Sequence, residues 1–304
     1  MPRIRVDDFI EDFDDSTLDH IQRPTRRSKP TWDATASDPD LPSGASRSTY
    51  QESRASQGPK PAPPWLVTTP SALDYERGRV KTGKEADVDL VERIDPDTGA
   101  SCLLAAKRYR SSHHRLFHRD AGYLEGRRVK RSRDNRAMDN RTGYGKAVIA
   151  VQWAAAEFQM LGHLWEAGVP VPYPVQYGGT DMLLEFIGDE DGTAAPRLAE
   201  LRPGPDEAGR DELDDLFGQC RRALLAMANR GCTHGDLSPY NLLVHHGRLV
   251  VIDLPQVVDV IANPEGPDYL RRDCRNICAW FTARGQHDAD ADALAADLLD
   301  AAGL

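Results

Sequence analysis

The chain has no apolar run that approaches the ~20 residues needed to span a bilayer. Its first residues, MPRIRVDDFIEDFDD, alternate charged with single apolar residues, which an export signal does not do. Cysteine is scarce, with five scattered residues in 304. Cys274 and Cys278 are one helical turn apart, but no His/Cys cluster elsewhere completes a zinc site with them. These absences predict a reduced, cytoplasmic protein with buried thiols and no membrane partner.

Net positive charge is also absent. The formal charge of −10 argues against a general nucleic-acid coat, because such proteins are usually basic. The charge is uneven, however, since residues 108–146 carry twelve Lys/Arg against four Asp/Glu. This segment is therefore kept basic while the rest of the chain is strongly acidic.

The composition changes along the chain. Residues 1–64 are rich in Asp, Ser, Arg and Pro without a sustained period, which predicts a mostly disordered extension. A short acidic docking segment around Ile4–Phe13 is the alternative to an ordinary acidic tail. Strand-like alternation and one long amphipathic stretch fill residues 65–186, and mostly helical patterns fill residues 187–304. This order predicts an α+β protein with two lobes of different character.

The stretch THGDLSPYNLLVHHGRLVVIDLPQ, residues 233–256, places polar residues at the ends of apolar runs. NLLV-HHGR-LVVID predicts a hairpin that brings Asn241 beside Asp253, with Asp236 on the loop entering the same end. An Asp and an Asn offer the oxygen ligands that Mg²⁺ prefers, and a third carboxylate can orient a hydroxyl or water. The layout is typical of kinase-type phosphoryl-transfer sites. The alternative is that the three residues only cap loops.

Such a site needs a second group that holds phosphates. Lys107 is expected on a strand and Glu157 within the apolar stripe of a helix, where an unpaired charge is costly. Pairing the two solves both problems and aims an ammonium at the phosphates, although both side chains could instead reach solvent separately. KTGKEA, residues 81–86, is a candidate phosphate-covering loop, but its single glycine is a weak signal.

Together these pieces resemble the RIO family of atypical protein kinases over roughly residues 65–285. The blocks that carry the resemblance are KTGKEADV, the lysine in AAKRY, WAAAEFQML, AGVPVPYPV, LLEFIG, THGDLSPYNLLV and VVIDLPQ. Ordinary protein kinases would show a fuller glycine-rich loop, an arginine before the catalytic Asp, and Asp-Phe-Gly. Here Gly235 replaces the arginine, and Leu254-Pro255 follows Asp253. Pro255 stands where the family often has a serine, and RPGPDEAGRDEL is an insertion that we expect to be a surface loop.

The resemblance implies a protein-kinase-like fold: an N-terminal lobe with an antiparallel sheet plus a helix, and a reduced, mostly helical C-terminal lobe. It implies ATP and Mg²⁺ as cofactors, with Mn²⁺ as the alternative metal. Asp236 matches the catalytic aspartate, Asn241 and Asp253 match metal ligands, and the residue at Asp253 can itself accept the phosphoryl group. The implied nucleotide contacts are Lys107, Glu157, the loop Thr82, Gly83, Lys84 and Glu85, the hinge residues Glu185 and Ile187, and Pro196 near adenine.

The implied activity is that of a Mg-ATP-dependent serine/threonine kinase, an ATPase, or both, acting on itself and on an unknown protein substrate. The basic loop 108–146 is then a solvated linker, a gate over the γ-phosphate, or a dock for a ribosomal or other anionic partner. Two alternatives stay open. One is a small-molecule phosphotransferase of the aminoglycoside or choline kinase type. The other is an assembly factor whose nucleotide state controls its association with ribosomal particles.

Overall fold

The computed structural model describes residues 41–52, 56–84, 86–110 and 143–304. The described chain divides into two compact units. The N-terminal unit runs to Gly162 and includes Tyr173–Phe186, and the C-terminal unit consists of His163–Pro172 and Ile187–Leu304. The docking segment considered at Ile4–Phe13 and most of the basic loop, residues 111–142, lie outside the described residues.

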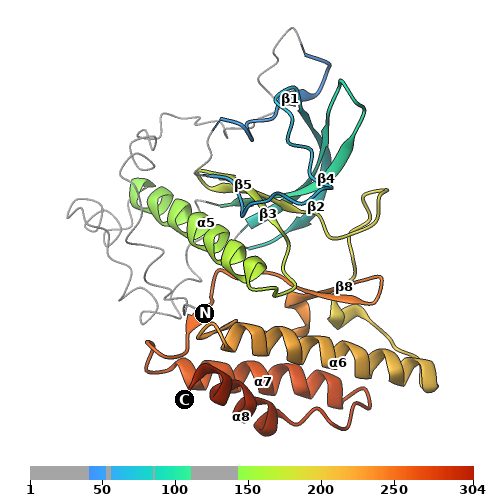
Figure 1. Ribbon diagram of the computed structural model, residues 1–304, viewed down its shortest axis with the longest axis vertical. Helices are drawn as coiled ribbons and strands as arrows, with labels where there is room; N and C mark the ends of the chain where they lie inside the picture. Colours follow the sequence, from blue (N-terminus) through green and yellow to red (C-terminus); the bar gives the residue numbers. More distant parts are fainter. Residues whose placement is uncertain (1–40, 53–55, 85, 111–142) are drawn as a thin grey trace. The chain divides into compact units, whose positions relative to one another are not determined.

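The N-terminal unit is built on a six-stranded antiparallel sheet with the order β1-β2-β3-β4-β6-β5 (Figure 1). The strand patterns predicted within residues 65–186 are confirmed as β2 Leu73–Thr82, β3 Ala86–Ile94, β4 Ser101–Tyr109 and β6 Asp181–Glu185. The sheet also contains β5 Pro174–Gly178, which was not predicted, and β1 Ala45–Arg47, which pairs with β2. The sheet therefore includes a short part of the segment 1–64 that is predicted to be mostly disordered.

A buried polar network explains why residues around 45–50 are ordered. Arg93 on β3 has no exposed side-chain surface and donates two hydrogen bonds to Asp74 on β2, at 2.7 and 2.9 Å. It also donates to Gln176 on β5 at 3.0 Å, and Gln176 in turn donates to Thr49 at 2.8 Å. Because a buried charge is tolerated only when it is paired, this network ties three strands and the preceding segment together.

Helix α5, Gly143–Glu166, belongs to the long amphipathic stretch predicted here. The stripe Trp153, Leu161 and Leu164 is buried, and Phe158 lies against Tyr177 of β5 with ring centroids 4.8 Å apart. Gly168 has a φ of 76°, and the Val169 N–H donates to the Leu164 carbonyl at 2.9 Å. This left-handed glycine ends the helix.

Asp181, at the start of β6, should make the stability of the protein depend on pH. Its side chain is 5% exposed, and burial raises its pKa from 3.8 to about 6. Because the raised value favours the protonated form in the folded state, stability is expected to fall as the pH rises from about 4 to about 6 and to stay lower above that. Asp181→Asn should therefore stabilise the protein at pH 7.5, by about 1–3 kcal/mol, and by much less at pH 4.5.

Thermal unfolding of Asp181→Asn and the unchanged protein between pH 4.5 and 7.5 tests this. Asp97→Asn is the matched control, because Asp97 is exposed in the turn between β3 and β4. Parallel stability curves for Asp181→Asn and the unchanged protein would show that Asp181 does not carry the effect.

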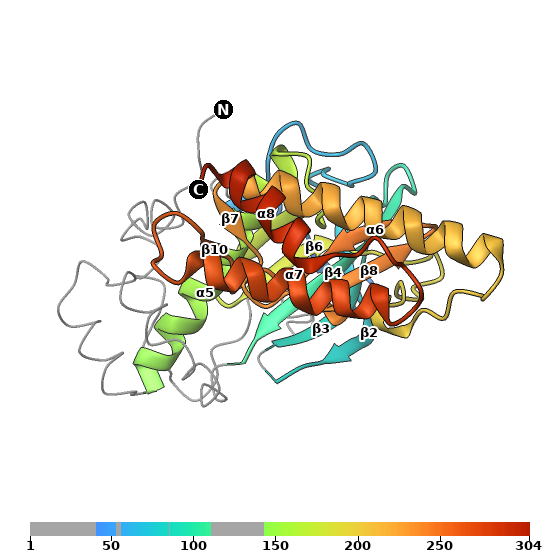
Figure 2. The same cartoon turned by 90° about the horizontal axis from the view of Figure 1, so that it is seen from below.

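Within its described residues, the C-terminal unit contains the α-helices α6 Glu207–Ala228, α7 Gly266–Thr282 and α8 Ala291–Ala302, together with two short 3-10 helices at Leu198–Glu200 and Pro239–Asn241. Figure 2 shows α7 and α8 running alongside each other, and α8 also contacts α6. Six apolar residues at helical spacing in α6 are all buried, in line with the helical pattern predicted for this part of the chain: Leu213, Leu216, Phe217, Cys220, Leu224 and Met227. No helix in the described ranges is long and apolar enough to cross a membrane.

Part of the insertion at residues 202–213, expected as a surface loop, is helical instead. The Asp206 side chain accepts a hydrogen bond from the Gly209 N–H at 3.0 Å and caps α6, which then begins at Glu207. An aspartate cap satisfies N–H groups that otherwise have no partner in the first turn, and it therefore extends the helix into a polar segment. All five cysteines are buried free thiols, as predicted.

Candidate active site

The predicted hairpin is present as β8, Leu242–His245, and β9, Arg248–Val251. Its register differs by one residue from the prediction. Leu242 pairs with Val251, so Asn241 lies opposite Ile252, whose N–H donates to the Asn241 carbonyl at 2.9 Å. The reason is the two-residue turn at His246–Gly247, where both residues have positive φ, instead of a turn centred on Gly247. Asp253 follows directly at the same open end.

Asp253 has an unusual backbone. Its φ is 67°, in the left-handed region that non-glycine residues rarely adopt and that Asp tolerates better than most. This conformation leaves the Asp253 side chain exposed at the end of the hairpin, while the next residue, Leu254, is buried at 1% exposure. Such strained positions are concentrated at functional sites.

The loop that carries Asp236 requires a glycine immediately before it. Gly235 has a φ of 81°, and a Cβ at this position would lie 2.1 Å from the Gln256 carbonyl oxygen. No other residue fits there without moving the chain that follows Asp253. This close approach gives a physical reason for the glycine that stands in place of the arginine of ordinary kinases.

Asp273 on α7 holds this loop in place. Its side chain is 1% exposed and accepts three hydrogen bonds: from the Thr233 hydroxyl at 2.9 Å, the Gly235 N–H at 2.7 Å and the Leu237 N–H at 2.9 Å. Asn276 donates to the Leu237 carbonyl at 3.1 Å, one turn further along the helix. Sequence reasoning missed Asp273, although a charged residue within the apolar stripe of α7 is a readable signal.

His234 connects the loop to the hairpin and was also missed. Its ring is fully buried, and Nε2 donates to the Ile252 carbonyl at 3.1 Å. Nδ1 accepts from the Asp236 N–H at 3.4 Å, so the two contacts require the tautomer with the proton on Nε2. The His234 ring thus fixes the backbone at Asp236 relative to the residue before Asp253.

The pKa of the Asp236 carboxyl is raised, which favours its role as a proton acceptor. Desolvation raises its pKa, as do the charges of Asp273 and Asp253, while His234 and Arg272 oppose the shift. A carboxylate with a raised pKa is a better acceptor for a hydroxyl proton. Asn241 completes the group, and its side-chain oxygen accepts from the Ser238 hydroxyl.

The N-terminal unit holds the second predicted group. The Lys107 ammonium on β4 lies 2.7 Å from the Glu157 carboxylate on α5, with side-chain exposures of 12% and 1%. The Tyr109 hydroxyl donates to the other carboxylate oxygen. The predicted pairing is confirmed, and its role in phosphate binding remains a prediction. Because Glu157 is almost completely buried, it fixes the position of the more accessible ammonium.

The candidate phosphate loop is a tight turn between β2 and β3. The Gly83 N–H donates to the Ala86 carbonyl at 2.9 Å, and a Cβ at Gly83 would lie 2.6 Å from that oxygen. Gly83 is therefore required by the turn, and its N–H is engaged within it. Phosphate contacts from Thr82 and Lys84 stay a prediction, and Glu85 lies outside the described residues.

The residues predicted near adenine lie at the end of β6 and beyond it. The Glu185 N–H donates to the Tyr173 carbonyl at 2.9 Å, and its carboxylate accepts from the Tyr173 N–H at 3.0 Å. The Ile187 carbonyl accepts from Ala195, and the Pro196 carbonyl accepts from the Val244 N–H at 2.9 Å. The segment thus folds back onto β8, while the adenine contacts themselves stay predictions.

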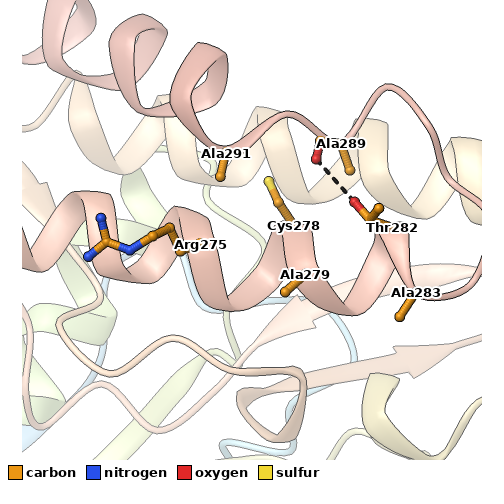
Figure 3. A pocket seen from close by; sticks show the side chains of 7 residues that line it. All are labelled: Arg275, Cys278, Ala279, Thr282, Ala283, Ala289 and Ala291. Carbon is orange, nitrogen blue, oxygen red and sulfur yellow. Dashed lines mark hydrogen bonds between the residues drawn. The ribbon is translucent and has the colours of Figure 1, made fainter.

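A separate cavity of about 570 Å³ lies along α7 and the start of α8 (Figure 3). Small side chains dominate its lining, and a hydrogen bond from the Thr282 hydroxyl to the Ala289 carbonyl, at 3.3 Å, spans one end. Its lining contains no carboxylate or amide side chain: Arg275, Cys278, Ala279, Thr282, Ala283, Ala289 and Ala291. The cavity therefore lacks the oxygen ligands that phosphoryl transfer needs, and it is not the site described above.

Two features of the described residues define the protein-kinase-like α+β class. One unit has an antiparallel sheet, a helix and a buried Lys–Glu pair. The other is mostly helical and carries an Asp-x-x-x-x-Asn loop and a following Asp. Comparison with known proteins specifies the family. Residues 104–294 match the RIO domain model. The chain therefore belongs to the RIO family of protein kinases.

Curated relatives agree with this assignment. The chain is 36% identical over 223 residues to the RIO-type serine/threonine-protein kinase Rio1 of Haloferax volcanii, covering 73% of this chain and 68% of that protein. It is 32% identical over 217 residues to serine/threonine-protein kinase RIO1 of Chaetomium thermophilum, covering 68% of this chain and 39% of that protein. It is 29% identical over 225 residues to mouse serine/threonine-protein kinase RIO3, covering 71% of this chain and 40% of that protein.

Proposed function

We propose that the protein is an ATP- and Mg²⁺-dependent serine/threonine kinase that phosphorylates itself and a protein substrate. The arrangement of Asp236, Asn241 and Asp253 carries the proposal. All three belong to one loop-and-hairpin structure, and Asp273 and His234 hold that structure in place. This arrangement supplies a proton acceptor with a raised pKa and hard oxygen ligands at the same end of the hairpin.

The donor set fits a hard divalent cation. Asn241 and Asp253 provide one amide and one carboxylate oxygen, which suit Mg²⁺ and, as the alternative, Mn²⁺. When bound there, the metal neutralises charge on the phosphates. Asp236 orients the acceptor hydroxyl and takes its proton, and Lys107 holds the phosphates. Thr82 and Lys84 add phosphate contacts, and the Glu185 and Ile187 backbone binds adenine beside Pro196.

A second acceptor is Asp253 itself. Its carboxylate is exposed at the end of the hairpin on a strained backbone, so it is accessible to an incoming phosphoryl group. Transfer to this oxygen would give an aspartyl-phosphate, and its hydrolysis would complete an ATPase cycle. The exposure of Asp253 is compatible with both roles, metal ligand and acceptor.

Substitution of Lys107 tests its proposed role in holding the phosphates of ATP. Lys107→Met should lower phosphoryl transfer by about 10²-fold or more, because it removes a charge that stabilises the transferring group. Lys107→Arg, which retains the charge beside Glu157, checks that the fold tolerates replacement. Arg77→Met, at an exposed position on β2 outside the loop 81–86, is the matched control. Equal transfer rates in Lys107→Met and Arg77→Met would contradict the assignment.

A protein kinase and a small-molecule phosphotransferase differ in the phosphoryl acceptors that they use. A screen of aminoglycosides, choline and other small alcohols should give no transfer above the rate of ATP hydrolysis alone. Phosphorylation of one of these compounds, without protein labelling, would replace the protein-kinase proposal with that of a small-molecule phosphotransferase.

The proposed ribosomal or other anionic partner depends on the basic segment 108–146. Two of its arginines are already paired in the sheet: Arg108 with Asp89 and Glu76, and Arg110 with Asp87. A partner would therefore contact the basic residues of 111–142. Co-sedimentation with small ribosomal subunits in ATP and in ADP tests this role, and equal absence from the pellet in both states would exclude it.

A further inference from the structure

Two adjacent histidines at the turn of the β8–β9 hairpin face one carboxylate. His245 Nε2 lies 3.1 Å from an oxygen of Asp189, and His246 Nε2 lies 3.6 Å from the same oxygen. The two ring centroids are 4.0 Å apart, and one ligand atom from each of the three residues lies within 4.8 Å of the others. This cluster is at the opposite end of the hairpin from Asn241 and Asp253.

The backbone explains why neighbouring side chains converge here. Successive residues of a strand normally point to opposite faces. His246 has a φ of 48°, which takes it out of the strand pattern and allows its ring to lie against that of His245. A residue in this left-handed conformation is usually Asn, Asp or Gly, so a second histidine is an uncommon choice for the turn.

The backbone that carries the Asp189 carboxylate is held by its own turn. The Asp189 N–H donates to the Thr193 carbonyl at 2.9 Å, and the Gly192 N–H donates to the Asp189 carbonyl at 3.0 Å. Gly188 also forms a bridge with Ala194. Both sides of the cluster are therefore held by backbone hydrogen bonds within the C-terminal unit.

Two of the three ligand–ligand distances are close to those in a tetrahedral metal site. Ligand bonds of about 2.0–2.2 Å place neighbouring ligand atoms about 3.3–3.6 Å apart. The two separations from the Asp189 oxygen to the histidine Nε2 atoms are 3.1 and 3.6 Å, the first just below this range and the second at its upper end. A single His–Asp hydrogen bond would explain one close nitrogen, but it does not require the second on the same oxygen. Side-chain exposures of 28%, 77% and 53% leave room for a water as fourth ligand.

We propose that Asp189, His245 and His246 bind one divalent transition metal of the Zn²⁺ class. Two imidazoles and one carboxylate favour Zn²⁺ and Co²⁺ over Mg²⁺, which prefers oxygen ligands. The bound metal cross-links the turn at residues 189–193 to the hairpin whose other end carries the candidate catalytic residues. It therefore stabilises the C-terminal unit, and this role is independent of the phosphoryl-transfer proposal.

The test uses the full, tag-free chain after EDTA treatment and desalting. Zn²⁺ at about 100 times its dissociation constant should raise Tm by about 5–10 °C. Isothermal titration should give one site per chain, and Co²⁺ should give the visible absorption of a tetrahedral complex. Asp189→Asn and His246→Asn should each lose this response, and the asparagine at position 246 tolerates the left-handed backbone.

Two controls separate this site from other histidines. His287→Asn removes an exposed histidine elsewhere in the C-terminal unit, and the double variant His113→Asn/His114→Asn removes the other adjacent histidine pair. Both controls should keep the full response to Zn²⁺. Binding that survives in Asp189→Asn and His246→Asn, or that is lost only in the His113/His114 variant, would overturn the proposal, as would no binding by the unchanged chain.

Discussion

Replacing Asp236 with asparagine should reduce phosphoryl transfer by about 10²–10⁴-fold, the usual contribution of a positioned proton acceptor. Nucleotide affinity should change by about twofold at most, because the proposed phosphate and metal contacts belong to Lys107, Asn241 and Asp253. The loop should keep its shape, since Asp273 and His234 bind its backbone and not the Asp236 carboxylate. Two measurements check this: the rate of phosphoryl transfer, and the nucleotide affinity from a titration with a fluorescent ATP analogue.

The matched control is Asp211→Asn, at an exposed position in the first turns of α6. It removes the same charge at a distance in sequence from the loop and should leave both quantities unchanged. A fully active Asp236→Asn protein would remove Asp236 from the catalytic role. Loss of ATP binding in this variant would instead make Asp236 a nucleotide contact.

Replacing Asp273 with asparagine should have the second large effect, a loss of stability. In Asp273→Asn, an NH₂ group replaces one oxygen of a carboxylate that accepts three buried hydrogen bonds. At least one donor then faces another donor, and buried hydrogen bonds to a charged group contribute about 1.5–3 kcal/mol each. We expect a loss of about 2–4 kcal/mol in the free energy of unfolding and slower transfer even where the variant is folded.

Urea denaturation measures the first effect, and transfer assays well below Tm measure the second. Asp268→Asn is the control on the same helix, because Asp268 is exposed and its side chain pairs with Arg271 only one turn away. That variant should lose less than about 0.5 kcal/mol. An Asp273→Asn protein as stable as this control would show that α7 does not fix the catalytic loop.

The hairpin and the Lys107–Glu157 pair could be predicted because each depends on a local rule. Alternation and a turn signal specify a hairpin, and a charge within an apolar stripe needs a partner. The register was wrong by one residue because it depends on the turn type, which the positive φ of His246 determines. Sequence alone does not show that a histidine adopts this conformation.

The residues that sequence reasoning missed depend on contacts between distant segments. Asp273 binds groups 36 to 40 positions earlier in the chain, and His234 binds a carbonyl 18 positions later. The ordered structure of residues 45–50 likewise depends on a hydrogen bond from Gln176 to Thr49, which lies 127 positions away in the chain. Asp189 and His245 are separated by 56 positions, so their proximity could not be inferred from spacing. Periodicity within a segment carries no information about such pairs.

Incubation of the protein with γ-labelled ATP and Mg²⁺ is the decisive test of phosphoryl transfer at Asp236. We expect Mg²⁺-dependent label on the protein that is absent from Asp236→Asn. Acid-stable label that resists hydroxylamine would identify Ser/Thr phosphorylation, and hydroxylamine-labile label would identify an aspartyl-phosphate, as proposed for Asp253. No ATP-dependent label with either Mg²⁺ or Mn²⁺, or equal labelling of the Asp236→Asn protein, would show that Asp236 does not catalyse phosphoryl transfer.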